Sequence, residues 1–256
     1  ELLLPKLKVI LENDEKLYKF LETILTDKRV QFKNNTIIEE KGIMEGIPIA
    51  EFLANVYLSD MDKKYYEQKV IYARYSGNII LFCRENELQQ RMIDLERELY
   101  KHQLSIDIKT RKLIAPGESW MFMGFYYQNA VIDLSEETKK KVKNDIKVVA
   151  RKIRKWMTNK NISSERALKM INKMFNKKFY EVKNEKGLTW YMWYFPVINT
   201  TKGLKEIDSY MQDYLRYIVT GKHSKTNYKS VRYIYLKQCG YKPLTVEYWR
   251  RYKDLK

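Results

Sequence analysis

The feature that most constrains the fold is a long stretch after Ser135 in which apolar residues recur at helical spacing and lysine or arginine fills many other positions. Its first apolar stripe consists of Val142, Ile146, Val149, Ile153 and Trp156. Residues three or four apart lie on one side of an α-helix, so the stripe predicts one buried face and a solvated basic face. Ser135 is the expected N-cap, because its hydroxyl can accept a hydrogen bond from a free backbone N–H of the first turn.

Two further helices are predicted in the same half of the chain. Ser163 or Ser164 is expected to cap a helix whose apolar positions are Leu168, Ile171 and Phe175. A third helix should run from about Leu204 to Val219 and stop at Gly221, since glycine readily takes the left-handed conformation that ends helices.

The first half of the chain has a mixed pattern of short helices and strands. We expect helices over 14–26, with Asn13 or Asp14 as N-cap, over 51–62 and over 87–104. We expect a hairpin over 28–40 with Asn34 and Asn35 at its tip, and two strands over 70–84 around Ser76-Gly77-Asn78, where Gly and Asn enter positive φ most easily. Further strands are expected around 105–113, 121–127 and 130–134.

Length and composition narrow the class of protein. The chain has 256 residues, of which 45% are apolar and 32% charged, as in folded globular proteins. No run of about 18 apolar residues is present, so we expect no membrane-spanning helix, and the first residues show no secretory signal pattern. Two cysteines and two histidines cannot build a disulfide framework or a typical zinc site, which favours a reducing, cytoplasmic setting.

The positive charge lies in one half of the sequence. Residues 1–130 contain 19 Lys and Arg against 20 Asp and Glu, whereas residues 131–256 contain 30 against 12. This asymmetry indicates a polyanionic partner for the C-terminal half, and we favour nucleic acid over a membrane. A solvated lysine-rich surface without a partner and an anionic membrane surface remain the alternatives.

Residues 42–62 resemble a motif of the reverse transcriptases. They read Gly-Ile-Met-Glu-Gly-Ile-Pro-Ile-Ala-Glu-Phe-Leu-Ala-Asn-Val-Tyr-Leu-Ser-Asp-Met-Asp, similar to that family's Gly-x-Pro-Gln-Gly-x-Pro-x-Ser…Leu-Ala-Asn-x-Tyr-Leu stretch. In the family this stretch shapes the pocket for the incoming nucleotide and the template. The resemblance implies that Gly42, Glu45 and Gly46, together with Tyr75, line such a pocket.

Later segments resemble further motifs of the same family in the same order. Residues 74–79, Arg-Tyr-Ser-Gly-Asn-Ile, are similar to the Arg-Tyr-Ala-Asp-Asp-Phe hairpin, and the segment from Leu104 to Thr110 resembles the helix-then-Lys segment. The hairpin that begins at Trp120 resembles the primer grip, which implies that role for Trp120, Phe122 and Gly124. The resemblance implies nucleic-acid binding by Arg74, Lys109, Lys140, Lys143, Lys147, Arg151, Arg154 and Lys155.

The basic helices after Ser135 resemble the thumb of bacterial group II intron, retron and antiphage-defence reverse transcriptases. The resemblance therefore implies an α+β fold, with a partial right-hand palm and some finger elements over residues 1–132 and an α-helical thumb over 133–256. The implied function is to grip an RNA or RNA–DNA template-primer. The parent activity of the family is RNA-directed DNA synthesis with Mg²⁺ and deoxynucleotides.

The sequence departs from the family where the metals would bind. The Asp pair of the hairpin is replaced by Gly77 and Asn78, and Glu1 corresponds to a point just after the family's upstream Asp strand. Two-metal phosphoryl transfer needs acidic ligands, so we expect no metal bound by this chain alone and no polymerisation by it. We do not expect the carboxylates at 60, 62, 85 and 87 to replace the lost pair. Met44, Glu45 and Ala50 also differ from the motif, which puts nucleotide selection in doubt.

Two explanations of the missing carboxylates stay open at this stage. The chain is a fragment or altered version of a longer active polymerase, completed by an N-terminal segment, or it is an inactive paralogue that binds structured RNA or partners an active subunit. A basic helical binding module without polymerase ancestry is a separate class, and it requires that the 70–84 hairpin not lie beside a 105–113 strand.

Of the remaining features, we expect the aromatic run at 190–196 to pack in the core and His223 to lie in a solvated loop.

Overall fold

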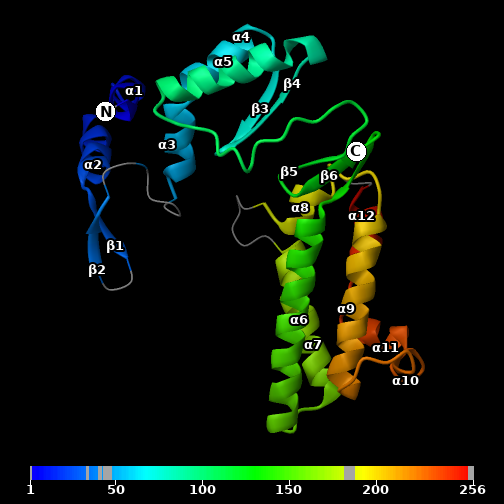
Figure 1. The fold of residues 1–256 in the computed structure, drawn as a ribbon. Helices are drawn as coiled ribbons and strands as arrows, with labels where there is room; N and C mark the ends of the chain where they lie inside the picture. The colour runs from blue at the N-terminus through cyan, green and yellow to red at the C-terminus, as the bar shows by residue number, and fades with distance from the viewer. Residues whose placement is uncertain (1, 33–34, 40–41, 43–47, 182–187, 253–256) are drawn as a thin grey trace. The chain divides into compact units, whose positions relative to one another are not determined.

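The computed structural model describes residues 2–32, 35–39, 42, 48–181 and 188–252 of the chain (Figure 1). The chain divides into two compact units, Glu1–Leu113 and Ile114–Lys256. The fold is α+β, as expected, and the described strands form small antiparallel sheets. In the part of the chain that the structure describes, no helix combines the length and the apolar character that a membrane span needs.

The first unit consists of short helices and two hairpins. Its helices are α1 (Leu3–Ile10), α2 (Glu15–Thr26), α3 (Ala50–Tyr57), α4 (Ser59–Glu67), the 3₁₀ turn η1 (Glu85–Glu87) and α5 (Leu88–Lys101). Its strands are β1 (Arg29–Phe32), β2 (Asn35–Ile38), β3 (Ile71–Tyr75) and β4 (Asn78–Phe82), paired β1–β2 and β3–β4. The predicted helix 14–26 is confirmed with Asp14 as its cap, and so is the hairpin over 28–40, although residues 33–34 of its tip lie outside the described residues.

The single helix predicted over 51–62 is wrong, because the chain forms two helices that break at Leu58. The break separates two apolar clusters. Leu53 and Val56 of α3 pack with Leu7 of α1, whereas Leu58, Met61 and Tyr65 pack with Leu99 of α5. One straight amphipathic helix has a single buried face, so the chain must change direction at Leu58 for its side chains to pack into two separate clusters.

The strand predicted over 105–113 is also wrong. Among the described residues, β3 and β4 form a two-stranded sheet, and residues 107–110 form a turn. The side chain of Asp107 accepts a hydrogen bond from the backbone N–H of Lys109, while its carbonyl oxygen accepts from Thr110. Such local side-chain bonds compete with strand pairing. Ile106 nevertheless packs against the same buried cluster of Leu58, Met61, Tyr65 and Leu99 as the apolar residues of the hairpin do.

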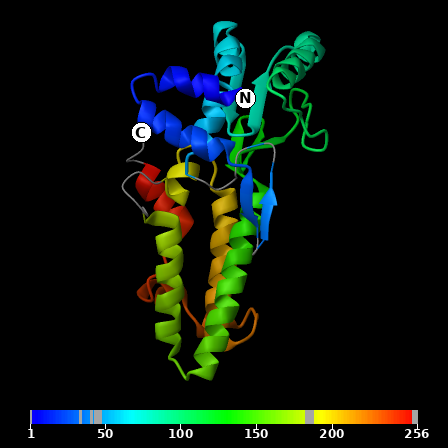
Figure 2. The ribbon, with the colours of Figure 1, turned by 90° about the vertical axis from the view of Figure 1, so that its left-hand side faces the viewer.

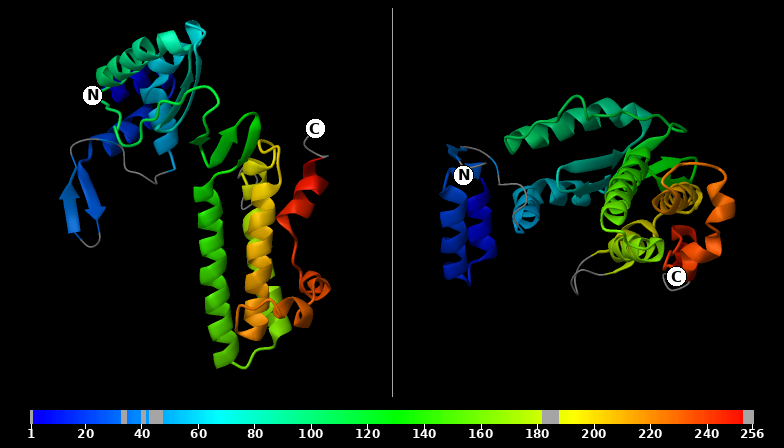
Figure 3. Two further views of the ribbon diagram at one scale, coloured as in Figure 1. Left: turned by 45° about the vertical axis from the view of Figure 1, so that its right-hand side comes forward. Right: turned by 90° about the horizontal axis from the view of Figure 1, so that it is seen from below.

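The second unit is built around three long helices, with a small sheet at one end (Figures 1 and 2). Its strands are β5 (Trp120–Phe122), β6 (Phe125–Gln128) and β7 (Val131–Leu134), in the order β5-β6-β7. Its helices are α6 (Glu136–Asn159), α7 (Ser164–Tyr180), α8 (Trp190–Tyr194), α9 (Lys202–Thr220), α10 (Asn227–Ser230), α11 (Tyr233–Gln238) and α12 (Leu244–Tyr252). Seen end-on, α6, α7 and α9 lie side by side (Figure 3).

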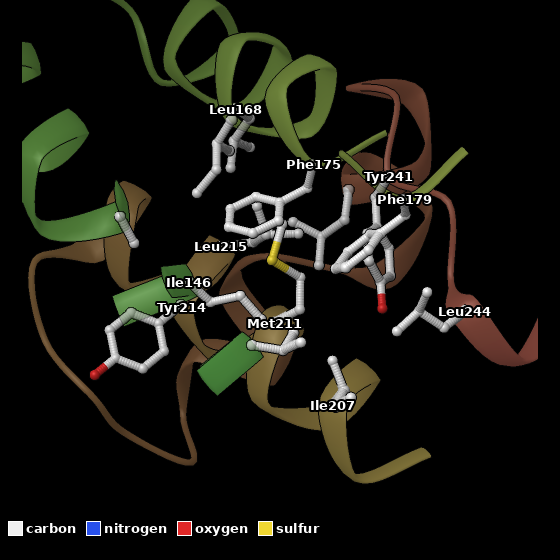
Figure 4. Packing of buried hydrophobic residues seen from close by; sticks show 14 of the residues in the cluster. Ile146, Leu168, Phe175, Phe179, Ile207, Met211, Tyr214, Leu215, Tyr241 and Leu244 are labelled. Atoms are coloured by element: carbon white, nitrogen blue, oxygen red, sulfur yellow. The ribbon is translucent and has the colours of Figure 1, made fainter. Parts of the chain in front are cut away.

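Local signals predicted these helices well. Ser135 and Ser163 cap α6 and α7 through their hydroxyls, and α9 ends at Gly221 with φ 77°. Apolar residues of the three long helices meet Tyr241 and Leu244 in one core (Figure 4). The buried stripe of α6 runs through Val142, Ile146 and Ile153, as predicted, but continues through Ala150 and Met157 rather than through Trp156.

The division between the units differs from the boundary placed at 132/133. The β5–β7 sheet belongs with the second unit, because its residues bond to α9 and to the segment that precedes α9. The carboxylate of Asp133 accepts from the backbone N–H of Gly203 at the start of α9, and the carbonyl oxygen of Ile132 accepts from the backbone N–H of Asn199. The segment over 121–127, expected as a strand from its pattern and as a hairpin from its resemblance, is a hairpin whose turn is formed by Met123 and Gly124.

Candidate functional site

The hairpin that resembles the catalytic hairpin of reverse transcriptases closes through a two-residue turn. Tyr75 pairs with Asn78, so Ser76 and Gly77 form the turn. Ser76 takes the positive φ of 52°, whereas we expected Gly or Asn to take it. A positive φ at the first central residue matches the right-handed twist of the strands, so the geometry of the hairpin places Ser76 there in spite of its Cβ.

The turn presents no carboxylate, because residues 77 and 78 are Gly and Asn. Both residues are exposed. A Cβ added at Gly77 would meet no atom within 4 Å, and the φ of Gly77 is an ordinary one. The backbone would therefore accept an aspartate at this position without strain.

The carboxylate of Asp62 on α4 contacts this hairpin and is bound by its side chains. Arg74 of β3 donates to both carboxylate oxygens of Asp62, and the hydroxyl of Tyr72 donates to Oδ1 at 2.8 Å. Burial alone would raise the pKa of Asp62, but these hydrogen bonds outweigh it and lower the pKa. Asp62 is thus held as a charged ion-pair partner, and Asp60 pairs with Lys6 at 2.6 Å.

Four of the five N–H donors of Arg74 are used within the first unit. Its guanidinium also donates to the carbonyl oxygen of Ser76 at 3.0 Å and to Oδ1 of Asn55 at 3.1 Å, and its side chain is 4% exposed. The structure therefore uses this residue of the motif to hold the turn against α3 and α4.

The residues expected to line a nucleotide pocket are only partly described. Glu45 and Gly46 lie outside the described residues, while Gly42 is exposed with φ 97°. Tyr75 is 46% exposed on β3. Because Glu45 and Gly46 lie outside the described residues, the nucleotide pocket stays a prediction.

The segment that resembles a primer grip forms the β5–β6 hairpin of the second unit. Trp120 packs against its register partner Tyr127, with the ring centroids 4.9 Å apart and the rings tilted by 33°, and Phe122 pairs with Phe125. Gly124 has φ 85°, and an added Cβ would lie 2.8 Å from both Oγ1 of Thr138 and the hydroxyl oxygen of Tyr194. The glycine is therefore required for the hairpin to dock on α6 and α8.

Not all of the expected nucleic-acid-binding cations of α6 are available. Lys143 pairs with Glu206 of α9, which also binds Lys139 at 2.7 Å. Arg154 donates to the carbonyl oxygens of Ile218 and Val219 at the end of α9. These side chains fasten α6 to α9. In the first unit, Lys109 is exposed in the 107–110 turn.

Four of the six α6 cations that were expected to bind nucleic acid make no ion pair or side-chain hydrogen bond in the described part of the chain: Lys140, Lys147, Arg151 and Lys155. They recur at helical intervals and therefore share one face of the helix. Lys141 and Lys152 of α6 also lack such partners, but their positions in the helix place them on a neighbouring side. Lys140, Arg151 and Lys155 are exposed and Lys147 is half-buried. We call this set the α6 basic face.

A row of tyrosines on α9 borders the α6 basic face, and none of them was among the expected site residues. Tyr210, Tyr214 and Tyr217 share one side of α9, and the Nζ of Lys143 lies 5.7 Å from the ring centroid of Tyr210. Burial raises the pKa of Tyr214, and the nearby charges of Arg151 and Lys147 oppose this rise. The spacing of the tyrosines was visible in the sequence, but their position beside α6 depends on how the helices pack.

The aromatic run at 190–196 and His223 were predicted to lie in the core and in a solvated loop, respectively. The run at 190–196 does pack in the core: Phe195 is fully buried, and Trp190 and Tyr194 lie against the same cluster. His223 is more engaged than expected. Its Nδ1 lies 2.6 Å from Oδ2 of Asp213, and its ring stacks on Tyr217 at 4.7 Å.

Among the described residues, no three His, Cys, Asp or Glu side chains gather in a way that could hold a metal ion. No protein-family model matches the chain, and no curated protein matches it.

Proposed function

We propose that the chain is a reverse-transcriptase-like protein that grips an RNA or RNA–DNA helix through the α6 basic face of its second unit. The observation that carries the proposal is the set of four α6 cations that the described protein leaves unpaired on one side of a long helix. Such a row matches a phosphate backbone, whose charges repeat along the duplex. A cytoplasmic location belongs to the same proposal.

The contacts of α6 support this use of its surface. The neighbouring cations Lys139, Lys143 and Arg154 are neutralised or bonded by α9, so the helix is fixed independently of a ligand. The four free cations are therefore held on a rigid element, which suits a surface that positions a duplex.

Fluorescence anisotropy with a labelled RNA–DNA hybrid tests the proposal. The variant replaces Lys140, Lys147, Arg151 and Lys155 by Gln, which keeps the helix because Gln is a good helix former. Its matched control replaces the exposed Lys177, Lys225, Lys229 and Lys237 by Gln, which removes the same charge from other surfaces.

We expect the α6 variant to weaken binding at least tenfold more than the control does. Equal weakening by the two variants would show that only net charge attracts the nucleic acid. No binding by the unaltered chain would refute the proposal altogether.

The same proposal holds that the chain does not synthesise DNA by itself. Mg²⁺ would then be a cofactor of an intact parent enzyme and not of this chain alone. This expectation rests on Gly77 and Asn78 at the hairpin turn, where the family resemblance implies the metal-binding Asp pair. An active reverse-transcriptase subunit or an N-terminal segment is then the partner that would supply carboxylates.

A second candidate is a non-catalytic module that binds structured RNA and has no polymerase ancestry. The observation that favours it is the two-stranded β3–β4 sheet, because the described residues 105–113 supply no third strand. The two candidates differ in their preferred ligand: the module should prefer a folded RNA, and the reverse-transcriptase-like protein should prefer a hybrid with a recessed 3′ end.

A further inference from the structure

Aromatic side chains form a continuous row along α9 and into the loop that follows it. The ring centroids of Tyr210 and Tyr214 lie 4.8 Å apart, and those of Tyr214 and Tyr217 lie 5.9 Å apart. The imidazole of His223 lies 4.8 Å from the ring of Tyr214 and 4.7 Å from that of Tyr217. Ring centroids about 4.5–7 Å apart are typical of aromatic contact, so the four side chains form one row that ends at the exposed His223.

The imidazole of His223 is held in one orientation by its neighbours. Its Nδ1 lies 2.6 Å from Oδ2 of Asp213, and its plane is within 4° of the ring plane of Tyr217. A hydrogen bond at one edge and a parallel ring on one face restrain both the rotation and the tilt of the imidazole. This exposed side chain is therefore preorganised, which lowers the entropy that a ligand loses on binding to it.

One face of this imidazole is open. Tyr217 covers the opposite face, and the centroids of Tyr214 and Tyr217 are 5.9 Å apart, too close to each other for the two rings to lie on opposite sides of the imidazole. In the part of the chain that the structure describes, these two rings are the ones that His223 contacts. Its side chain is 43% exposed, so the face that points away from Tyr217 is accessible to a ligand.

The loop after α9 lies against α6. A Cβ added at Gly221 would lie 2.7 Å from Nη2 of Arg154, so the first residue of the loop touches that helix. Lys147 and Arg151 of the α6 basic face lie about two turns and one turn before Arg154 on the same side of α6. Their charges oppose the rise in the pKa of Tyr214, so they lie close to the aromatic row. The row and the α6 basic face therefore adjoin.

Cations beside an accessible aromatic face suit a nucleotide whose base is not enclosed in a duplex. The cations bind phosphate, whereas an aromatic face binds a nucleobase by stacking, and histidine is among the side chains that stack on unpaired bases. Asp213 occupies Nδ1 of His223, and its negative charge disfavours a phosphate at that edge. Inside a duplex both faces of a base are covered by its neighbours, so only an unstacked base can lie on the imidazole.

We propose that the nucleic acid held by the α6 basic face carries an unpaired base that stacks on the open face of His223. This inference rests on the proposed function and narrows its ligand to a helix with an unpaired nucleotide. The unpaired base comes either from a single-stranded end or from a bulge within the helix. Both sources offer the same π-face, and stacking of this kind tolerates any base.

Binding of an RNA–DNA hybrid whose short single-stranded extension contains 2-aminopurine tests the stack, because this base analogue loses fluorescence when it stacks on an aromatic ring. The comparison ligands are the blunt hybrid, a hybrid with 2-aminopurine in a bulge, and a hybrid with an abasic extension, which keeps the phosphates and lacks the bases. Anisotropy of an end label gives the affinity, and the 2-aminopurine emission reports the stacking.

Two variants separate the ring of His223 from its nitrogens. His223→Ala removes the ring, whereas His223→Phe keeps a ring that can stack on Tyr217 and lacks the nitrogens. The matched control Tyr100→Ala removes an aromatic side chain that is 81% exposed on α5. Each variant changes an exposed residue, so folding should be preserved.

We expect the extended hybrid to bind at least about fivefold more tightly than the abasic one, with its 2-aminopurine quenched. His223→Ala should remove both effects, and His223→Phe and Tyr100→Ala should keep them. The bulged hybrid should show the same gain if a bulge is the source, and none if an end is. Equal affinity for the extended and abasic hybrids, or quenching that survives in His223→Ala, would overturn the proposal.

This proposal and the proposed function fail separately. Hybrid binding that depends on the α6 basic face but not on His223 would leave the proposed grip standing and refute the stacking site. No binding of any of these hybrids by the unaltered chain would refute both.

Discussion

Arg74 of β3 makes paired hydrogen bonds to the carboxylate of Asp62 on α4. The same guanidinium reaches the carbonyl oxygen of Ser76 and the side chain of Asn55. One arginine thus ties the hairpin and its turn to two helices of the first unit. The arrangement assigns the nearby carboxylate to an ion pair, so it is not free to replace a missing metal ligand.

The substitution Arg74→Met should lower the free energy of unfolding by about 2–3 kcal/mol, because it leaves Asp62 partly buried without its cation. Urea denaturation of Arg74→Met, Asp62→Asn and the double variant measures the coupling. We expect the double variant to lose less than the sum of the single losses. Additive losses would mean that the pair contributes nothing beyond its separate side chains.

Gly124→Ala should destabilise the second unit by about 1–3 kcal/mol, since the new Cβ would lie 2.8 Å from Thr138 and Tyr194 at a positive φ. Gly77→Ala is the matched control, because a Cβ there meets nothing within 4 Å and its φ is ordinary. Thermal unfolding of both variants provides the comparison. A Gly124→Ala protein as stable as Gly77→Ala would show that the hairpin relaxes freely.

Arg216→Met should cost about 2–3 kcal/mol of unfolding free energy. Arg216 is 2% exposed, donates to the carbonyl oxygens of Val231 and Gln212, and lies 4.0 Å from the ring centroid of Tyr228. Its removal takes this donor from the carbonyl oxygen of Val231 and the cation from the ring of Tyr228. Chemical denaturation measures the loss, and the exposed Lys229→Met should change stability by less than about 0.5 kcal/mol.

Glu206 should make stability depend on acid pH. Hydrogen bonds from Lys139 and Lys143 lower its pKa below the ordinary value of 4.5, so its contribution is present above pH 4.5 and is lost as the pH falls through the lowered value. We expect Glu206→Gln to be less stable than the unaltered chain by about 1 kcal/mol at neutral pH, and the difference to vanish in acid. A difference that persists unchanged at acid pH would contradict this ion-pair origin.

The structure accommodates acidic residues at the hairpin turn, which gives a direct test of the catalytic deficit. We expect the unaltered chain to bind Mn²⁺ no more than its surface carboxylates allow and to extend no primer. Gly77→Asp/Asn78→Asp should add Mn²⁺ affinity, detectable by electron paramagnetic resonance, because both positions are exposed and unstrained. Primer extension by the unaltered chain with Mg²⁺ would defeat the inactivity proposed for it.

The parts of this fold that depend on residues adjacent in the sequence could be predicted from the sequence. The caps at Ser135 and Ser163 and the stop at Gly221 act within one turn, so their signals lie in adjacent residues. The break at Leu58 could not be predicted this way, because it arises from two separate apolar clusters. Local periodicity also predicted a strand at 105–113, where the side chain of Asp107 forms a turn instead.

The candidate site likewise has features that follow from the local sequence and features that depend on how the helices pack. The basic face of α6 follows from helical spacing, but the sequence could not separate the free cations from those used within the protein. Lys143 meets Glu206, and Arg154 meets Ile218, across more than 60 positions of the chain. Such pairings depend on how α6 and α9 pack, so only the structure distinguishes a surface lysine from a fastening one.

The salt dependence of hybrid binding tests the central claim most directly. For the unaltered chain, the logarithm of the binding constant should fall steeply with the logarithm of salt concentration. Replacing the four free α6 cations by Gln should reduce this slope by about 0.9 for each lost phosphate contact, roughly 3–4 in total, while the control that changes Lys177, Lys225, Lys229 and Lys237 should leave it nearly unchanged. A slope that is the same in the α6 variant, or binding that ignores salt between about 50 and 200 mM, would contradict the account.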